Sequence, residues 1–320
     1  MGQTVFDTFE DPRKVFGAAV SSAANIIKNI VILSADSGNS SGFGSFMRDC
    51  PERYFEFGIM EQGVTGFASG LAATGKIPIF CAIAPFVTSR PFEMFRNDLG
   101  YMRQNVKIVG RNSGVSYSDL GATHHSLEDF AIIRMIPGVA VLAPTDPDEI
   151  RSAVIAMIEH EGPVYMRIGN APIPNLFEYR DFIIGRGRVV TPGKDVTLVS
   201  TGSITANAVE AAEELSRRRI SVELLAMPSI APFDRELLVK SAGKTGRVVT
   251  LEEHYIIGGL GTIVQEILCD TLPLRVKKLG LPHDYTSSGP YDALLAYYGL
   301  DAAGIANAIE SYVHNTSDYM

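Results

Sequence analysis

Residues 57–73 read FGIMEQGVTGFASGLAA and place one carboxylate, that of Glu61, at the start of an otherwise small and apolar helix. A helix that is apolar on all sides is normally buried, so we expect this helix to lie inside the protein. An ionised carboxylate in that setting needs a partner or takes up a proton. On position alone, the simpler explanation is a first-turn acid that interacts with the helix dipole, a contact worth about 0.3–1 kcal/mol. The rest of the sequence has to decide between the two.

Length and composition limit the classes of protein. The chain has 320 residues, which predicts two domains of roughly 150 residues each. Its formal net charge of -8 argues against a nucleic-acid partner. Cys50, Cys81 and Cys269 are too few and too far apart for a disulfide framework or a thiolate zinc site, which indicates a reduced, cytoplasmic setting. We expect no membrane span and no secretory leader, because no apolar run reaches about 18 residues.

Short β-branched runs alternate with helical patterns along the chain, which predicts two doubly wound α/β domains. Strands are expected at residues 30–33, 77–82, 106–109, 139–142 and 164–167, and then at 195–200, 221–225 and 247–251. Helices are expected near residues 12–29, 60–74, 90–104, 126–136 and 146–160, and then near 204–218, 257–270 and 301–314. Pro172 and Pro174 predict a linker, so we divide the chain into a domain at 1–172, a linker at 173–186 and a domain at 187–320.

Polar clusters follow several of these strands, at residues 36–40, 111–113 and 123–129. Ligands of α/β sheets bind just beyond the carboxyl ends of the strands, but the same residue types also favour plain turns. His124 and His125 are adjacent and so point in different directions, which argues against a shared metal. A helix cap and a substrate-contacting imidazole are both compatible with this pair. No His-Glu-x-x-His or Cys-x-x-Cys pattern occurs, so no metal site is expected in this chain.

Ordered motifs carry a family resemblance along most of the chain. They are Gly58-Ile59-Met60-Glu61, Gly121-Ala122-Thr123-His124-His125, Pro144-Thr145-Asp146, Glu252-Glu253-His254 and Tyr298-Gly299-Leu300-Asp301. From Asp11 to about Ile309 the chain resembles the C-terminal half of transketolase, and also the corresponding parts of deoxyxylulose-phosphate synthase and the 2-oxoacid dehydrogenase β subunit. The resemblance implies a thiamine diphosphate enzyme, with the pyrimidine-binding domain at 1–172 and the transketolase C-terminal domain at 187–320.

The resemblance also implies roles for individual residues near the cofactor. Glu61 matches the family's acid that bonds the aminopyrimidine ring and so activates the cofactor. Phe86 matches an aromatic residue that stacks on the pyrimidine. Ile83 and Ser89 stand where two further aromatic residues are found, so stacking is thinner here. His124 matches an active-site histidine that touches the oxygen atoms of the substrate.

The substrate end departs from the family pattern. Arg13 and Ser40 match positions that bind the acceptor phosphate, whereas a third anchor, an arginine in the family, is replaced by Asn170. Leu120 stands in the place of an aspartate that reads sugar hydroxyls. The candidate substrate-binding residues are Arg13, Ser40, Arg111, His124, His125 and Arg167, with Arg111 or Arg167 as the replacement for the missing anchor. These departures put the usual pentose phosphates in doubt.

The Gly-Asp-Gly segment that holds the diphosphate and Mg²⁺ in transketolases does not occur in this chain. The chain therefore resembles one subunit of a split transketolase, and we expect a separate N-terminal partner subunit in an α2β2 assembly. The expected reaction moves a two-carbon ketol unit from a phosphorylated or otherwise acidic ketose to an aldehyde or other acceptor. Two alternatives stay open. One is an E1 β-like subunit or a hybrid that loads a carrier protein, and the other is a non-catalytic scaffold subunit.

Overall fold

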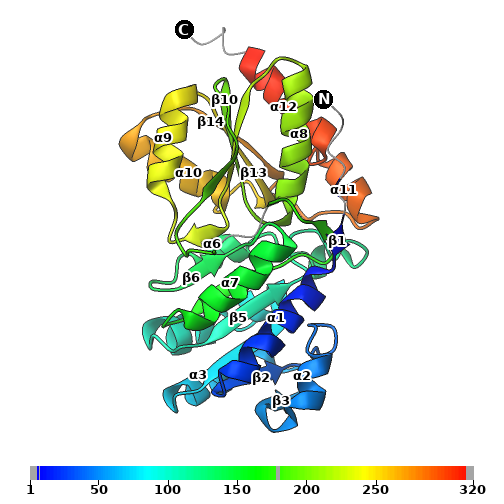
Figure 1. The fold of residues 1–320 in the computed structure, drawn as a ribbon, viewed down its shortest axis with the longest axis vertical. Helices are drawn as coiled ribbons and strands as arrows, with labels where there is room; N and C mark the ends of the chain where they lie inside the picture. Colours follow the sequence, from blue (N-terminus) through cyan, green and yellow to red (C-terminus); the bar gives the residue numbers. More distant parts are fainter. Residues whose placement is uncertain (1–5, 7, 178–180, 315–320) are drawn as a thin grey trace.

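Two mainly parallel β-sheets organise the molecule, one in each half of the chain (Figure 1). The computed structural model describes residue 6, residues 8–177 and residues 181–314. The first sheet has the order β12-β6-β7-β5-β4-β2-β3, and only β12 is antiparallel to its neighbour. Its strands are β2 (Ile30–Ser34), β3 (Tyr54–Glu56), β4 (Ile77–Ile83), β5 (Lys107–Arg111), β6 (Ala140–Leu142), β7 (Val164–Arg167) and β12 (Ser229–Ala231). Because β12 comes from the second half of the chain, the two halves share this sheet.

The second sheet has the order β14-β13-β10-β11-β9, with β9 antiparallel to β11. Its strands are β9 (Arg188–Thr191), β10 (Val196–Ser200), β11 (Val222–Ala226), β13 (Val248–Tyr255) and β14 (Val276–Leu281). A separate two-stranded ladder joins β1 (Phe9–Glu10) to β8 (Ile173–Pro174) in antiparallel register. Buried Val, Ile and Leu side chains fill the central strands, as expected for parallel sheets that are covered on both faces.

Helices cover both sheets (Figure 1). Those of the first half are α1 (Pro12–Ile26), α2 (Gly44–Asp49), α3 (Glu61–Ala73), α4 (Ala84–Thr88), α5 (Phe92–Met94), α6 (Asp129–Ile133) and α7 (Pro147–Glu159), with a π-helical turn η2 (Phe95–Tyr101) and 3₁₀ turns η1 (Pro51–Arg53) and η3 (Gly121–Thr123). Those of the second half are α8 (Thr205–Arg217), α9 (Arg235–Thr245), α10 (Leu260–Thr271), α11 (Tyr291–Tyr297) and α12 (Ala302–His314), with a 3₁₀ turn η4 (Gly202–Ile204).

The predicted fold class and all eight predicted strands are confirmed. Two helix predictions were too long. The helix expected at 90–104 begins only after Pro91 and then widens into η2, and the helix expected at 126–136 is limited to α6, because Ser126 pairs with Gly114 in a β-bridge. The sequence patterns also missed several short elements, among them α4 and the edge strand β14, whose two lysines suit an edge more than a core.

The expectation that α3 is buried on all sides is wrong. Val64 and Ala68 are buried, but Phe67 is 43% exposed on the opposite side of the helix. Phe67 contacts the ring of Phe57, with 4.7 Å between centroids, and lies close to Phe55. We call this exposed area, made of Phe55, Phe57, Phe67 and the adjacent Ile59 and Met60, the β3–α3 patch. Apolar area of this kind is typical of a surface that another chain covers.

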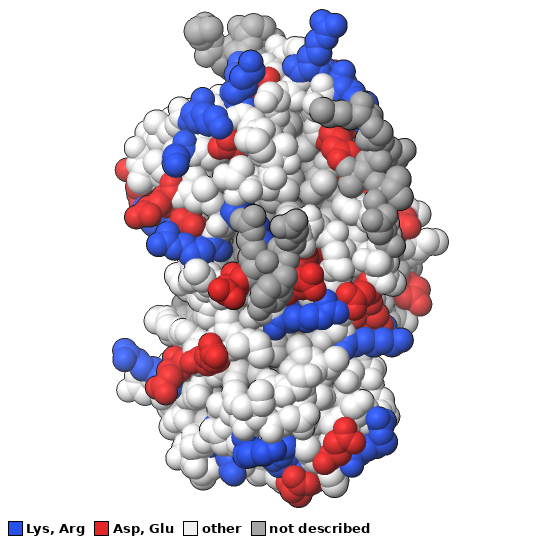
Figure 2. All heavy atoms as spheres, viewed as in Figure 1, with Lys and Arg blue, Asp and Glu red and all other residues white. Residues whose placement is uncertain are grey.

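Charge is mixed on the face of the molecule that Figure 2 shows. Figure 2 shows basic and acidic side chains interspersed on the face in view. Within the described ranges, no helix has the length and apolar character needed to cross a bilayer.

Candidate active site

The carboxylate of Glu61 lies buried at the first position of α3. The chain turns out of β3 through Gly58, whose φ of +70° is in the left-handed region that favours glycine. It then enters α3 without a side-chain cap from Met60, so Glu61 occupies the first turn. Glu61 is only 6% exposed. Its Oε1 accepts a hydrogen bond of 2.7 Å from Nη1 of Arg90. The partner that a buried carboxylate needs is therefore Arg90.

Phe86 lies in α4, which begins at Ala84 directly after β4 ends at Ile83, and Arg90 links Phe86 to Glu61. The guanidinium of Arg90 covers the Phe86 ring, with Cζ 3.5 Å from the ring centroid. The ring of His124 meets Phe86 edge-on, with 5.3 Å between centroids. Three residues predicted from the sequence thus meet at one place, although α3, α4 and the loop before α6 contribute them separately.

Glu61 and Phe86 present a carboxylate and an aromatic ring, the two kinds of group that can hold the planar, hydrogen-bonding half of thiamine diphosphate. Arg90 shows this directly, because its planar guanidinium stacks on Phe86 while it donates to Glu61. An aminopyrimidine is also planar, and its ring nitrogen presents a donor at its edge when it is protonated. The residues present therefore fit the pyrimidine ring of the cofactor that the sequence analysis expects.

The two adjacent histidines point in different directions, as their spacing predicts. The ring of His124 lies between Phe86 and Tyr117, and its Nδ1 is 2.9 Å from the hydroxyl of Thr123. His125 is buried and turns toward the second half of the chain, where its Nδ1 is 2.6 Å from Oγ1 of Thr286. Burial lowers the pKa of His125. The structure therefore brings His124, and not His125, to the Glu61–Phe86 pair.

The positions of Ile83 and Ser89 flank Phe86 in the chain. Ile83 ends β4 and lies opposite Arg111 in the parallel register of β4 and β5. Ser89 follows α4, and its hydroxyl donates to Oε1 of Glu128 at 3.4 Å. Burial raises the pKa of Glu128, so this pair adds a protonatable group near the site.

Arg111 lies at the end of β5 and is 5% exposed. Its guanidinium donates to Oγ of Ser40 at 2.8 Å, to Oγ of Ser41 at 3.2 Å and to Oδ1 of Asn112 at 2.8 Å. Within the described ranges no carboxylate lies within ion-pair distance of Arg111. Burial lowers the pKa of Arg111, and the nearby charge of Arg13 lowers it as well. The positive charge of Arg111 is therefore buried without an acid to balance it.

Arg13 lies near Arg111 but has an acid of its own. Its Nε and Nη2 donate to the two carboxylate oxygens of Asp11, at 3.0 and 2.8 Å. This hydrogen bonding raises the pKa of Arg13. Tyr117 lies near both Arg13 and Arg111, and its ring contacts His124. Tyr117 thus joins the arginine pair to the Glu61–Phe86–His124 group.

Arg167 lies elsewhere, at the junction of the two halves. It is buried, its Nη1 donates to Oδ1 of Asp129 at 2.8 Å, and its Nη2 donates to the backbone oxygen of Glu253 at 2.9 Å. These contacts hold the two halves of the chain together, which argues against the predicted role of Arg167 in substrate binding. Asn170, which replaces the family's arginine anchor, donates to the backbone oxygen of Ser116 at 3.3 Å.

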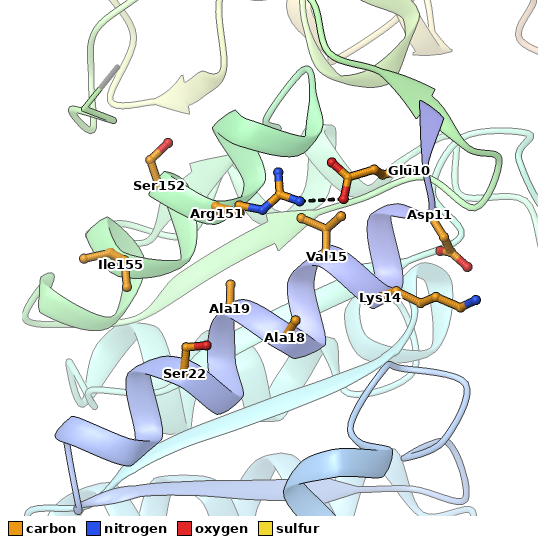
Figure 3. Close-up of a pocket in the computed structure, with 10 residues that line it drawn as sticks. All are labelled: Glu10, Asp11, Lys14, Val15, Ala18, Ala19, Ser22, Arg151, Ser152 and Ile155. Carbon is orange, nitrogen blue, oxygen red and sulfur yellow. Dashed lines mark hydrogen bonds and ion pairs between the residues drawn. The ribbon is translucent and has the colours of Figure 1, made fainter. Parts of the chain in front are cut away.

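Other cavities contain none of the predicted catalytic or cofactor residues. Figure 3 shows a groove of about 680 Å³ between α1 and α7, with an ion pair of Glu10 and Arg151 at its edge. Small side chains such as Ala18 and Ser22 line it. Among the described residues, no group of three or more histidine, cysteine or acidic side chains is arranged to hold a metal ion.

Comparisons with known proteins agree with this geometry. Residues 11–172 match the family model of the transketolase pyrimidine-binding domain, and residues 185–305 match that of the transketolase C-terminal domain. The chain is 37% identical to a subunit of the apulose-4-phosphate transketolase of Phocaeicola vulgatus, over 94% of this chain and 97% of that protein. It is 36% identical to the 6-deoxy-6-sulfo-D-fructose transketolase subunit of a Clostridium species, over 87% of each. A solved structure described as a split gene transketolase, an inactive β4 tetramer, superposes with a TM-score of 0.89 at 40% identity, over 95% of this chain and 98% of that one.

The chain belongs to the transketolase family. Within the family it is a β-type subunit of the split kind, a thiamine diphosphate-dependent, ketol-transferring subunit that acts with an N-terminal partner subunit. The comparisons do not favour the E1 β-like, carrier-loading or scaffold alternatives.

Sequence reasoning missed Arg90 and Tyr117. For Arg90 a partial signal was present, because it follows Phe86 by four positions, although α4 ends at Thr88 and Arg90 lies in the turn after it. The signal went unused because α4 itself was not predicted. Tyr117 lies in the loop that leads into η3, where spacing does not indicate which side chains meet.

Proposed function

We propose that Glu61, Phe86 and His124 form this chain's half of the cofactor and substrate site, and that the partner subunit holds the diphosphate and Mg²⁺ in an α2β2 assembly. The observation that carries the proposal is the planar group of Arg90, which is hydrogen-bonded to Glu61 and stacked on Phe86. A carboxylate and a ring face that hold a guanidinium in this way also provide the two contacts that an aminopyrimidine needs.

Each residue then has a definite task. Thiamine diphosphate, when bound, supplies the carbon nucleophile that accepts the two-carbon unit. Glu61 would hold the aminopyrimidine at a ring nitrogen and hold or move a proton at its own carboxylate, and Phe86 would stack on the ring and exclude water. His124 has Nδ1 engaged by Thr123, which leaves Nε2 to bind substrate oxygens and to move a proton there.

The substrate is a sugar with an anionic group at its far end. Arg111 supports this, because in the described part of the chain its buried charge has the neutral partners Ser40, Ser41 and Asn112 and no acid, with Arg13 nearby. The names of two relatives specify a phosphorylated sugar and a sulfo-sugar, both of which are anionic. A phosphate or sulfonate that binds Arg111 would balance this charge.

Three observations support the assembly and its location. The β3–α3 patch, which includes Phe55 and Phe67, begins next to Glu61, so a partner that covers the patch would also close the site. The solved relative is described as inactive as a β4 tetramer, which supports a need for the other subunit. Cys50, Cys81 and Cys269 are free thiols, which supports a reducing, cytoplasmic location.

The test uses the chain together with its partner subunit. Glu61→Gln should lower turnover by about 10²-fold or more, because removal of a positioned proton-transfer group costs that much. Glu93→Gln is the matched control, since Glu93 is an exposed acid on α5 that pairs with Arg96. Unchanged ketol transfer by Glu61→Gln would disprove the assignment.

A further inference from the structure

Arg90 makes, within the free chain, the same two contacts that we assign to the aminopyrimidine. Its Nη1 donates to Glu61 at 2.7 Å, and its guanidinium plane covers Phe86 at 3.5 Å. We propose that Arg90 is an internal occupant of the pyrimidine site, which holds Glu61 and Phe86 ready in the free chain and swings out when the cofactor binds. This inference rests on the proposed roles of Glu61 and Phe86.

The two occupants exclude each other. Aromatic rings that pack together place their centroids about 4.5–7 Å apart, whereas Cζ of Arg90 is 3.5 Å from the centroid of Phe86. No second ring fits between them. At the carboxylate, Nη1 of Arg90 takes the position on Oε1 of Glu61 that lies on the same side as Phe86, so the two contacts are lost together when the side chain leaves.

Arg90 is placed so that it can leave without disturbing the fold. Its side chain is 44% exposed, while that of Glu61 is only 7% exposed. Its backbone is held independently, because the carbonyl of Arg90 accepts from Nε2 of Gln62 at 3.0 Å and its amide donates to the carbonyl of Pro85 at 3.4 Å. A rotation of the side chain into water therefore opens the site and leaves α3 and α4 where they are.

The charge of Arg90 also explains how Glu61 is tolerated before the cofactor arrives. A buried carboxylate without a partner is costly, and Arg90 provides that partner from the solvent side. The cost to function is a reduced apparent affinity, since a ligand binds only the fraction of molecules in which the site is open. If Arg90 fills the site in about nine molecules of ten, its removal tightens binding roughly tenfold.

The probe is 4-amino-5-hydroxymethyl-2-methylpyrimidine, the aminopyrimidine half of thiamine, which needs no diphosphate-binding partner. Its affinity for the full chain is measured by ligand-observed NMR. Arg90→Ala should bind roughly tenfold more tightly than wild type, a change of about 1.4 kcal/mol. Arg90→Lys keeps the positive charge but lacks the planar guanidinium. Its affinity for the probe should therefore lie between those of wild type and Arg90→Ala. Arg96→Ala is the matched control, because Arg96 pairs with the exposed Glu93 and should bind as wild type does.

A second readout follows Arg90 itself. The Nε–Hε signal of Arg90, assigned by its loss in Arg90→Ala, should move to the position of a solvent-exposed arginine when the probe saturates the wild-type chain. Binding of the probe without any change in this signal would overturn the proposal. So would an Arg90→Ala variant that binds the probe no more tightly than wild type, or not at all.

Further variants separate this inference from the proposed function. Adding Glu61→Gln or Phe86→Ala to Arg90→Ala should remove the gain in affinity. If the gain persists in both double variants, the pyrimidine does not bind at Glu61 and Phe86, and the proposed function fails. If Phe86→Ala alone weakens binding and Arg90→Ala weakens it too, the cofactor site stands and Arg90 is one of its contacts, which overturns the internal-occupant proposal.

Discussion

Replacing Arg111 by methionine should separate anion recognition from structure. The side chain is buried, and its partners Ser40, Ser41 and Asn112 are all neutral. Methionine is unbranched and flexible like the stem of arginine, and although it is shorter, it keeps an apolar side chain in the site while it removes the charge and the donors. We therefore expect an effect on anionic substrates and almost none on the fold.

The size of the effect follows from the contacts. A hydrogen bond to a charged group contributes about 1.5–3 kcal/mol, so loss of one guanidinium–anion contact should lower kcat/KM for an anionic acceptor by about 10- to 150-fold. Stability should behave differently. Since Arg111 has no acid within ion-pair distance in the described ranges, its loss leaves no buried charge unpaired. The free energy of unfolding should therefore stay within about 1 kcal/mol of wild type or rise.

The assay compares two acceptors with the assembled enzyme. Glyceraldehyde 3-phosphate and glyceraldehyde differ only in the phosphate, and we expect Arg111→Met to lose activity with the first and to keep it with the second. Binding of inorganic phosphate to the free chain, followed as an increase in Tm, should weaken in parallel. Equal losses with both acceptors would refute the reasoning, and so would a loss of several kcal/mol of stability.

Two further predictions concern buried groups at the junction of the halves. Arg167→Met should lower the free energy of unfolding by about 3–5 kcal/mol, because it leaves Asp129 buried without its cation, and a urea titration showing the same stability as Arg111→Met would contradict this. Burial lowers the pKa of His254 from 6.5 to about 4, so the unfolded chain binds an extra proton between these pH values and the folded state loses stability as pH falls through them. His254→Gln lacks this proton, and its stability relative to wild type should improve by roughly 2 kcal/mol from pH 7 to pH 5, whereas a constant difference in urea unfolding would count against the assignment.

Local patterns predicted the strands well, because a buried parallel strand needs a continuous apolar run and such runs are visible in the sequence. They failed where tertiary contacts override local preference. The helix expected at 126–136 is shortened because Ser126 pairs across to Gly114. The apolar composition of α3 does not mean that the helix is buried on all sides. One face packs in the core, and the other presents Phe67 at the surface.

In the candidate site, too, some residues could be named from the sequence and others only from the structure. Glu61, Phe86 and His124 were named from the sequence, and the structure brings them together. Their individual roles follow from the resemblance to transketolases and stay predictions. Arg90 and Tyr117 were not found, because their importance comes from rings and charges that reach them from other elements.

The sequence by itself determined the family, the two α/β domains and the unusual acid at the start of α3. Only the tertiary structure decided which partner each buried or half-buried arginine has. Arg111 and Arg167 are similarly buried and lie on neighbouring strands, yet Arg167 meets Asp129 and Arg111 meets no acid in the described part of the chain, while Arg90 reaches Glu61. The physical reason is that the energy of a buried charge depends on the groups within a few ångströms of it, and folding brings those groups from distant parts of the chain.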